Sequence, residues 1–194
     1  VIERQTGQLA RLVDDLLDVS RITRGKLRMK GEAMDLNVAV HRALESSRPL
    51  IDARRQSLEL DLAEHPLPVH GDMTRITQVI VNVLNNAAKY TPEGGRIEIE
   101  SAQDDDECVV RVGDNGMGIP PYFLERVFDL FAQGERTLDR SEGGLGIGLT
   151  LARRIVALHG GAIVARSEGV GRGAEFEVRL PRLEVDLADL REAS

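Results

Sequence analysis

The sequence predicts an α+β fold in which helices cover one face of a mixed β-sheet. Segments such as residues 73–90 repeat apolar residues with the period of an amphipathic helix. Residues 96–101 and 107–114 instead alternate apolar and polar side chains, which indicates paired strands with one buried face. Helices and strands do not alternate regularly along the chain, and this favours an α+β layer over repeated strand–helix–strand units.

The first element is expected to be one long amphipathic helix over residues 1–24. Its apolar residues Ile2, Leu9 and Leu16 repeat every seven positions, which is typical of a helix that packs on another helix. Packing on its own domain is the alternative. Gly25 is the expected stop signal. Because the chain starts in mid-helix rather than at a methionine, we expect it to be a piece of a longer protein.

The next residues connect this helix to a second one. Alternation around Leu27 and Met29 predicts a short strand or an extended linker. A helix running to about residue 55 follows. Its N-cap is expected to be Asp35 or Asn37.

The rest of the chain alternates short strands, loops and helices. Residues 57–62 predict a strand, residues 65–72 a loop, and Asp72 the N-cap of the helix at 73–90. The remaining expected elements are paired strands at 96–101 and 107–114, a short helix at 122–128, a helix at 147–161 and a closing hairpin at 162–181.

Composition limits the functions available to this fold. Of 194 residues, 42% are hydrophobic and 29% charged, and the formal net charge is -7. The acidic balance and the absence of Trp argue against a nucleic-acid binder. The single cysteine, Cys108, excludes an internal disulfide and is expected to be a small buried hydrophobe. No apolar run approaches the roughly 20 residues needed to cross a bilayer, and no signal peptide is visible.

Three asparagines on the helix at 73–90 are predicted to differ in role. At about 100° per residue, the core face is expected to hold Ile76, Val79, Ile80, Val83, Leu84 and Ala87. Asn85 then points to solvent, whereas Asn82, Asn86 and Lys89 share one edge of the core face, where they can contact one ligand together. Amide oxygens suit Mg²⁺, and amide N–H and ammonium groups suit phosphate. Capping and surface amides are the alternative.

Two glycine clusters extend this pattern. In DNGMGIP, Asp114 ends an apolar strand and Gly116 and Gly118 follow. Asn-Gly alone indicates a turn. The second glycine and the following helix favour instead a backbone that approaches a flat ligand, with Asp114 accepting from an exocyclic amine such as that of adenine.

The second cluster, EGGLGIGL, enters a helix, where exposed backbone N–H groups favour an anion. It is neither a Walker loop nor a dinucleotide fingerprint. A further stretch, GVGRGAEF, is weaker and is consistent with a simple hairpin turn. Together, an amide edge, an amine acceptor and a phosphate loop predict a nucleotide site.

The order of these stretches resembles the nucleotide-binding boxes of bacterial sensor histidine kinases. The matching stretches are NVLNNAAKYTPEGG, DNGMGIP, FDLFAQ, GGLGIGL and GRGAEF, for the asparagine, first glycine, phenylalanine, second glycine and third glycine boxes. The helix RLVDDLLDVSRITRGKL is similar to the second helix of the dimerisation and phosphotransfer hairpin. The resemblance implies hairpin helix and linker at 1–30, an ATP-binding catalytic domain at 31–183, and a tail or linker at 184–194.

The resemblance implies a Bergerat ATP-binding fold, a two-layer α/β sandwich, and a role for each matched residue. Asn86 would be the Mg²⁺ ligand and would form the catalytic pair with Lys89, while Asp114 would bind the adenine amine. The other implied nucleotide-binding residues are Asn82, Tyr90, Gly116, Gly118, Ile119, Gly144, Leu145, Gly146, Gly148 and Leu149. The glycines from 144 to 148 would anchor a mobile lid. Phe128 and Phe131 either form the phenylalanine box or belong to the core.

Family members use ATP and Mg²⁺, form homodimers, and pass the γ-phosphate to a histidine on a helix hairpin of the same or a partner subunit. The phosphate then moves to the receiver domain of a response regulator. The resemblance implies the same partners, no nucleic acid, and a cytoplasmic location, alone or as part of a membrane-bound sensor. The histidines of this chain, His41, His65, His70 and His159, lack the acceptor motif. We therefore expect the phosphoacceptor to be absent from this chain.

Alternative interpretations remain at this stage. Arg136 and Arg140 are either γ-phosphate contacts or solvated charges. An ATPase of the same fold is a second hypothesis, but its water-activating acid is expected near the start of the asparagine helix, where this sequence has Gln78. A non-catalytic, nucleotide-dependent interaction module is a third.

Overall fold

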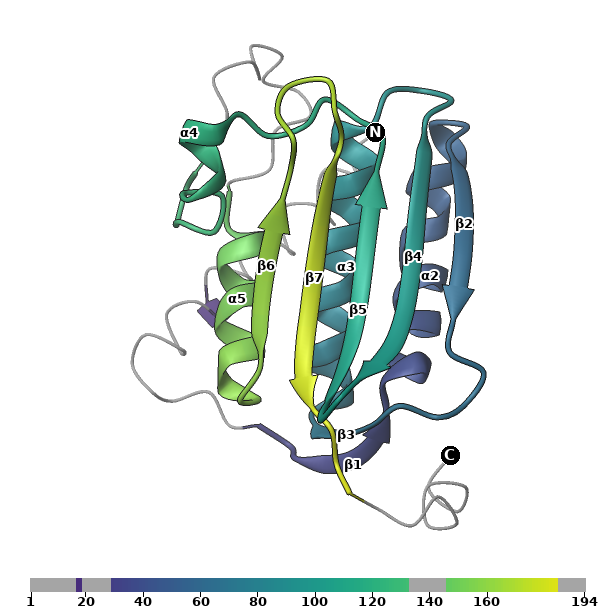
Figure 1. Cartoon of the computed structure of the whole chain (residues 1–194), viewed down its shortest axis with the longest axis vertical. Coiled ribbons are helices and arrows are strands. Elements are labelled where there is room, and N and C mark those ends of the chain that lie inside the picture. The colour runs from purple at the N-terminus through teal and green to yellow at the C-terminus, as the bar shows by residue number, and fades with distance from the viewer. Residues whose placement is uncertain (1–16, 19–28, 133–145, 185–194) are drawn as a thin grey trace.

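The computed structural model describes residues 17–18, 29–132 and 146–184. Within them, a five-stranded sheet packs against one layer of helices (Figure 1). The strands are β2 (Ser57–Leu62), β4 (Arg96–Asp104), β5 (Glu107–Asp114), β6 (Ala162–Arg166) and β7 (Ala174–Pro181). The helices are α2 (Leu36–Ala53), α3 (Met73–Tyr90), the short α4 (Pro121–Leu124) and α5 (Gly148–Leu158). The predicted α+β fold with two layers is confirmed.

The sheet is mixed, as expected. Its strand order is β2-β4-β5-β7-β6. β2 pairs with β4 in parallel, and the other neighbours are antiparallel. The two predicted hairpins, β4–β5 and β6–β7, are both present.

A small second sheet corrects the prediction for residues 65–72. Pro68–Gly71 is a strand, β3, rather than a loop, and it pairs antiparallel with β1 (Glu32–Asp35). β1 also lies further along the chain than the strand expected around Met29. Neither strand is marked by local alternation, because the pairing joins segments far apart in sequence and seats Met34 and Val69 in the core. Pro68 is tolerated because it is the first residue of its strand.

Two of the helices begin as predicted. The Asp35 carboxylate accepts from the Asn37 N–H at 3.0 Å and caps α2. The Asp72 carboxylate accepts from the Arg75 N–H at 3.2 Å and caps α3. These contacts satisfy backbone N–H groups that have no partner inside the helix. α4 is shorter than the helix expected at 122–128.

The central helix α3 lies between α2 and α5 and carries most of the predicted core face. Its buried residues are Ile76, Val79, Ile80, Val83, Leu84, Ala87 and Ala88. Asn85 is only partly exposed, whereas the helical projection placed it straight out to solvent. Because α2 and α5 pack on both sides of α3, its outward edge is narrower than the projection of an isolated helix. Cys108 is buried as expected, and this burial raises the pKa of its thiol to about 11.

The predicted N-terminal helix lies mostly outside the described residues. Leu17 and Asp18 are helical, and the Asp18 carboxylate accepts from both terminal nitrogens of the Arg75 guanidinium near the start of α3. None of the helices in the described part of the chain is long and apolar enough to cross a membrane.

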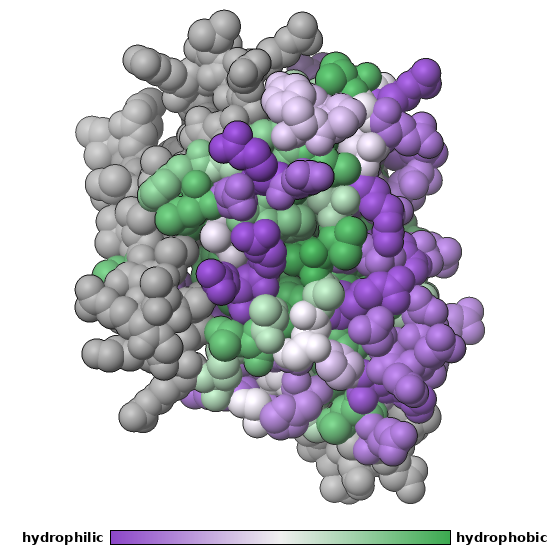
Figure 2. Space-filling view, turned by 60° about the vertical axis from the view of Figure 1, so that its left-hand side comes forward, coloured by the Kyte–Doolittle hydropathy of each residue, from purple (hydrophilic) through white to green (hydrophobic). Residues whose placement is uncertain are grey.

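The outer face of the sheet is charged, and it occupies the hydrophilic right-hand side of the view in Figure 2. Glu177 of β7 lies on this face and is only 2% exposed, because arginine side chains cover it. Its carboxylate accepts from Arg111 at 2.7 Å, Arg166 at 3.0 Å and Arg179 at 2.8 Å. Burial alone would raise the pKa of Glu177, but the three arginine hydrogen bonds outweigh it and lower the pKa to about 2.

Replacing Glu177 by Gln is expected to destabilise the domain at pH 7 by about 3 kcal/mol, because three arginines lose their shared anion. The folded-state pKa lies below the usual value, so this stabilisation is present above pH 4.5 and is lost between pH 4.5 and about 2. Urea unfolding of both proteins at pH 7 and at pH 3 measures the effect. Glu175→Gln, which removes one exposed partner of Arg166, is the control and should cost under about 1 kcal/mol. An equal loss in both variants would contradict the central role of Glu177.

Candidate functional site

The polar edge of α3 combines the three side chains that the sequence placed there. The Asn82 amide donates to the Gly148 carbonyl at 3.0 Å and so joins α3 to the first turn of α5. Asn86 lies one turn further along and is partly exposed, and its amide makes no hydrogen bond within the described residues. Lys89 donates to the Tyr90 hydroxyl at 3.0 Å, and its ammonium lies 4.6 Å from the centre of that ring. Along this edge, the start of α5 is therefore followed by the Asn86 amide, which has no partner among the described residues, and by the Lys89 ammonium, which is held only by its neighbour Tyr90.

Asp114 ends β5 and is half-buried. Its carboxylate accepts from the Gly116 N–H at 2.8 Å. Burial raises the pKa of the Asp114 carboxyl above its usual range, and the backbone N–H groups of Gly116 and Ala174 only partly oppose that shift. A carboxylate kept from water in this way gains by accepting a hydrogen bond from a ligand.

Two glycines after Asp114 are required by close backbone contacts. A Cβ atom on Gly116 would lie 2.4 Å from the Tyr90 carbonyl oxygen at the end of α3. Gly118 has a φ of +67°, and a Cβ there would lie 2.0 Å from the Gly169 carbonyl oxygen in the β6–β7 loop. These glycines allow the loop after β5 to contact both α3 and the β6–β7 hairpin. A simple turn at Asn-Gly would not require these contacts.

The second glycine cluster is described from Gly146 onward. Gly146 has a φ of +70°, and its carbonyl accepts from the Phe131 N–H at 3.2 Å. Gly148 is the first residue of α5, and no side chain among the described residues caps the start of this helix. The first backbone N–H groups of α5 are therefore suited to an anion. Four residues singled out from the sequence lie outside the described residues: Arg136, Arg140, Gly144 and Leu145.

The apolar residues expected near the nucleotide are mostly core residues. Ile119 and Leu149 are buried in the hydrophobic core, so only part of each side chain can reach a ligand. Phe128 is also buried and packs edge-on against Phe176, with ring centres 6.2 Å apart. Phe131 is 58% exposed, so the two phenylalanines of the box differ in environment.

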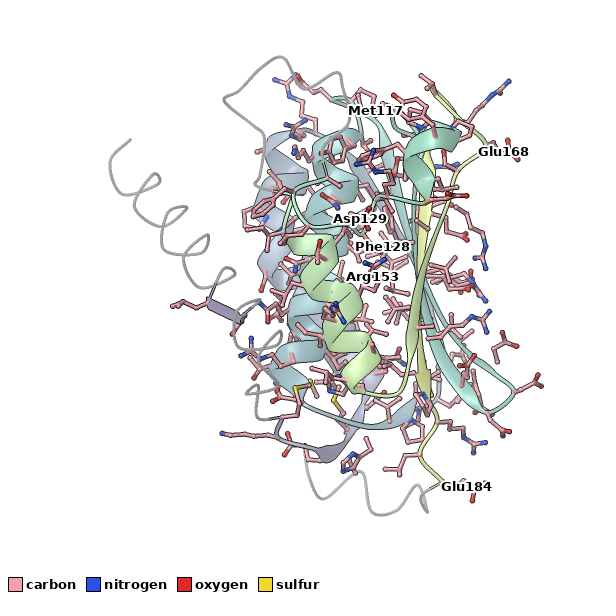
Figure 3. All side chains as sticks on the ribbon, turned by 90° about the vertical axis from the view of Figure 1, so that its left-hand side faces the viewer. Met117, Phe128, Asp129, Arg153, Glu168 and Glu184 are labelled. Atoms are coloured by element: carbon pink, nitrogen blue, oxygen red, sulfur yellow. The ribbon has the colours of Figure 1, made fainter. Side chains whose placement is uncertain are left out.

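Phe128 is held by charged neighbours as well as by the core. The Arg153 guanidinium of α5 lies 5.5 Å from the centre of the Phe128 ring and 3.8 Å from the Asp129 carboxylate. Figure 3 shows these three side chains together beside α5. The contacts tie the segment before Phe131 to the helix that follows Gly146.

Sequence reasoning missed two polar residues that support the site. The buried Gln56 amide donates to the carbonyls of Ala88 at 2.9 Å and Thr91 at 2.8 Å, and so caps the C-terminal end of α3. The Ser167 hydroxyl links the loop after β5 to the β6–β7 loop. No local pattern marks either residue, because the contacts with Ala88, Thr91 and Ile119 join segments that are far apart in the sequence.

The comparisons with known proteins agree with this geometry. The family of histidine kinase-, DNA gyrase B- and HSP90-like ATPases matches residues 71–184. The chain belongs to this family. The alginate biosynthesis sensor protein KinB of Pseudomonas aeruginosa is 36% identical over 180 residues, which cover 93% of this chain and 29% of KinB.

Similar solved structures indicate which branch of this family the chain resembles, namely the histidine kinases. The mycobacterial sensor histidine kinase MprB is 30% identical, with a TM-score of 0.68, over 79% of this chain and 98% of that one. Full-length ShkA in complex with AMPPNP is 26% identical, with a TM-score of 0.80, over 94% of this chain and 38% of that one. The chain is therefore an ATP-binding domain of the histidine kinase type, and it spans less than a third of the length of KinB.

Replacing Asp114 by Asn is expected to lower the ATP affinity of this histidine kinase domain about tenfold or more, because a charged acceptor is lost. The same replacement should not lower the free energy of unfolding at pH 7. The pKa of Asp114 is raised in the folded state, so its charge lowers stability as pH rises above the usual value of 3.8. Isothermal titration with ATP and thermal unfolding measure the two effects. Unchanged ATP affinity together with a lower unfolding temperature would show that Asp114 is only structural.

Proposed function

We propose that this domain binds Mg²⁺-ATP and transfers the γ-phosphate to a histidine on a helix hairpin. The observation that carries the proposal is the hydrogen bond between the Asn82 amide and the Gly148 carbonyl. It brings the polar edge of α3 against the uncapped start of α5, so that Asn86 and Lys89 continue from a helix N-terminus. An amide, an ammonium and free backbone N–H groups together suit a polyphosphate.

The purine end of the nucleotide would lie at Asp114. Its carboxylate, already partly removed from water, would accept from the exocyclic amine of adenine. The glycines after it leave room for backbone to approach the flat ring. Full-length ShkA forms a complex with AMPPNP, an ATP analogue, and this similarity supports an adenine nucleotide in this chain.

The magnesium ion would be held at Asn86. In the described part of the chain, no group of three or more His, Cys, Asp or Glu side chains could hold a metal. Mg²⁺ bound with ATP does not need such a cage, because water and phosphate oxygens complete its shell around one or two protein ligands. The Asn86 amide, which has no hydrogen-bond partner among the described residues, fits this role. When bound, Mg²⁺ would neutralise phosphate charge during transfer.

The residues of this chain would act by positioning and by charge. Lys89 would exchange its hydrogen bond with the Tyr90 hydroxyl for a phosphate oxygen, at small cost because both groups are partly exposed. The start of α5 would orient the phosphates through its backbone N–H groups. Phosphoryl transfer needs little more than such alignment and charge neutralisation.

The assignment of Asn86 makes a metal-dependent prediction. Asn86→Ala is expected to weaken ATP binding about tenfold in the presence of Mg²⁺, because one oxygen ligand is lost, and to leave binding in EDTA unchanged. Asn85→Ala, which changes the adjacent asparagine, is the matched control and should behave as the unmodified chain. Titration of all three proteins with ATP, with and without Mg²⁺, gives the comparison. Equal effects with and without the metal would remove the assigned role.

The transfer reaction is tested with a separate hairpin that carries the acceptor histidine. We expect acid-labile phosphohistidine to form when the chain, the hairpin and ATP labelled at the γ-phosphate are mixed, and none with a hairpin whose histidine is replaced by alanine. Rapid ATP hydrolysis without the hairpin would instead favour an ATPase. ATP binding without transfer would favour an interaction module.

The partners follow from the same proposal. The relatives are sensor kinases, and the whole protein would act as a homodimer that passes phosphate to the receiver domain of a response regulator. The phosphoacceptor hairpin would be supplied by the same or a partner subunit. A cytoplasmic location fits access to ATP.

A further inference from the structure

The loop of the β6–β7 hairpin, residues 167–173, packs on the loop that follows Asp114. The Gly171 N–H donates to the Met117 carbonyl at 2.7 Å, and the Gly173 N–H donates to the Gly116 carbonyl at 3.1 Å. Figure 3 shows Met117 and Glu168, one from each loop, at the same end of the molecule. The third glycine stretch is therefore more than a turn: it forms the support of the loop that carries the proposed adenine acceptor.

The Ser167 hydroxyl joins these two loops, because one of its hydrogen bonds reaches Ile119 in the loop after Asp114 and the others stay within its own loop. It accepts from the Ile119 N–H at 2.9 Å and from the Gly169 N–H at 3.3 Å. It donates to the Gly173 carbonyl at 2.6 Å. Only a hydroxyl both donates and accepts at this size, so alanine would leave three backbone groups short of a partner.

A continuous chain of hydrogen bonds leads from this hydroxyl to Asp114. Ser167 fixes the carbonyl of Gly173, the Gly173 N–H fixes the carbonyl of Gly116, and the Gly116 N–H donates to the Asp114 carboxylate at 2.8 Å. The Gly116 residue that donates to Asp114 is thus hydrogen-bonded to Gly173, whose carbonyl Ser167 holds.

Steric contacts leave little freedom between these links. Gly173 has a φ of +70°, and a Cβ there would lie 1.9 Å from the Asp114 carbonyl oxygen. The backbone of the hairpin loop therefore touches the backbone of Asp114 directly. A displacement of Gly173 moves Asp114 with it, and hydrogen bonds weaken quickly when their length or angle departs from the optimum.

We propose that Ser167 is a positioning residue that sets the adenine selectivity of this domain by fixing the orientation of the Asp114 carboxylate. The inference rests on the proposed function, because it assumes that Asp114 accepts from the adenine amine. Ser167 itself has no contact with the nucleotide in this proposal. Its loss should weaken the part of the affinity that depends on the amine and spare the part that depends on the phosphates.

The experiment compares binding of ATP and of ITP, whose purine carries an oxygen in place of the amine. For Ser167→Ala we expect ATP affinity to fall about tenfold and ITP affinity to change less than about twofold, so that the ratio between them falls about fivefold or more. Ser167→Thr retains the hydroxyl and should restore the ratio. Ser46→Ala is the matched control, since its hydroxyl is exposed and bonds only within α2.

Two outcomes would overturn the inference alone. One is unchanged affinity for both ATP and ITP in Ser167→Ala, and the other is an equal fall in affinity for both nucleotides, which indicates a purely structural role. If the unmodified chain binds ATP and ITP equally, the proposed role of Asp114 fails, and the inference fails with it. If Ser167→Ala does not fold, the same comparison of ATP and ITP affinity can be made with Ser167→Cys. Its thiol has a similar size but is a poor donor and acceptor.

Discussion

The structure depends on the burial of one side of α3. Its apolar stripe packs between the sheet and the flanking helices α2 and α5, and this burial fixes the rotation of the helix about its axis. With this rotation fixed, the edge that carries Asn82, Asn86 and Lys89 faces the start of α5. The same helix thus supplies the centre of the core and one wall of the proposed ATP site. A change in its packing would move both.

The remaining walls come from loops whose positions are set by backbone contacts. The end of α3, the loop after Asp114 and the β6–β7 hairpin loop meet at distances that only glycine allows, at Gly116, Gly118 and Gly173. Loops built in this way have few alternative arrangements, because their shape comes from main-chain hydrogen bonds rather than from long side chains. On the outer face of the sheet, side chains rather than main-chain contacts limit the alternative arrangements. There one buried carboxylate is shared among three arginines.

Much of this could be predicted from the sequence because the signals are local. Periodicity gives α2, α3, α5 and the two hairpins, and helical geometry places Asn82, Asn86 and Lys89 on one edge. The strands β1 and β3 could not be predicted in this way, since their pairing joins distant segments. Ser167 and Gln56 were missed for the same reason: the contact of Ser167 with the loop after Asp114 joins residues 48 apart, and the contact of Gln56 with Ala88 joins residues 32 apart. The sequence does not reveal whether a hydroxyl or an amide has a hydrogen-bond partner on another element.

The contact between Phe131 and Gly146 has a consequence for how this domain can vary. The Phe131 N–H donates to the Gly146 carbonyl, so the folded core itself brings together the two ends of the segment between them. The entropy cost of closing such a loop grows only with the logarithm of its length, by about 0.6 kcal/mol for each doubling. Insertions and deletions between these two residues should therefore leave the core almost unaffected. The length and charge of the chain between these two residues can therefore change while the domain keeps its stability.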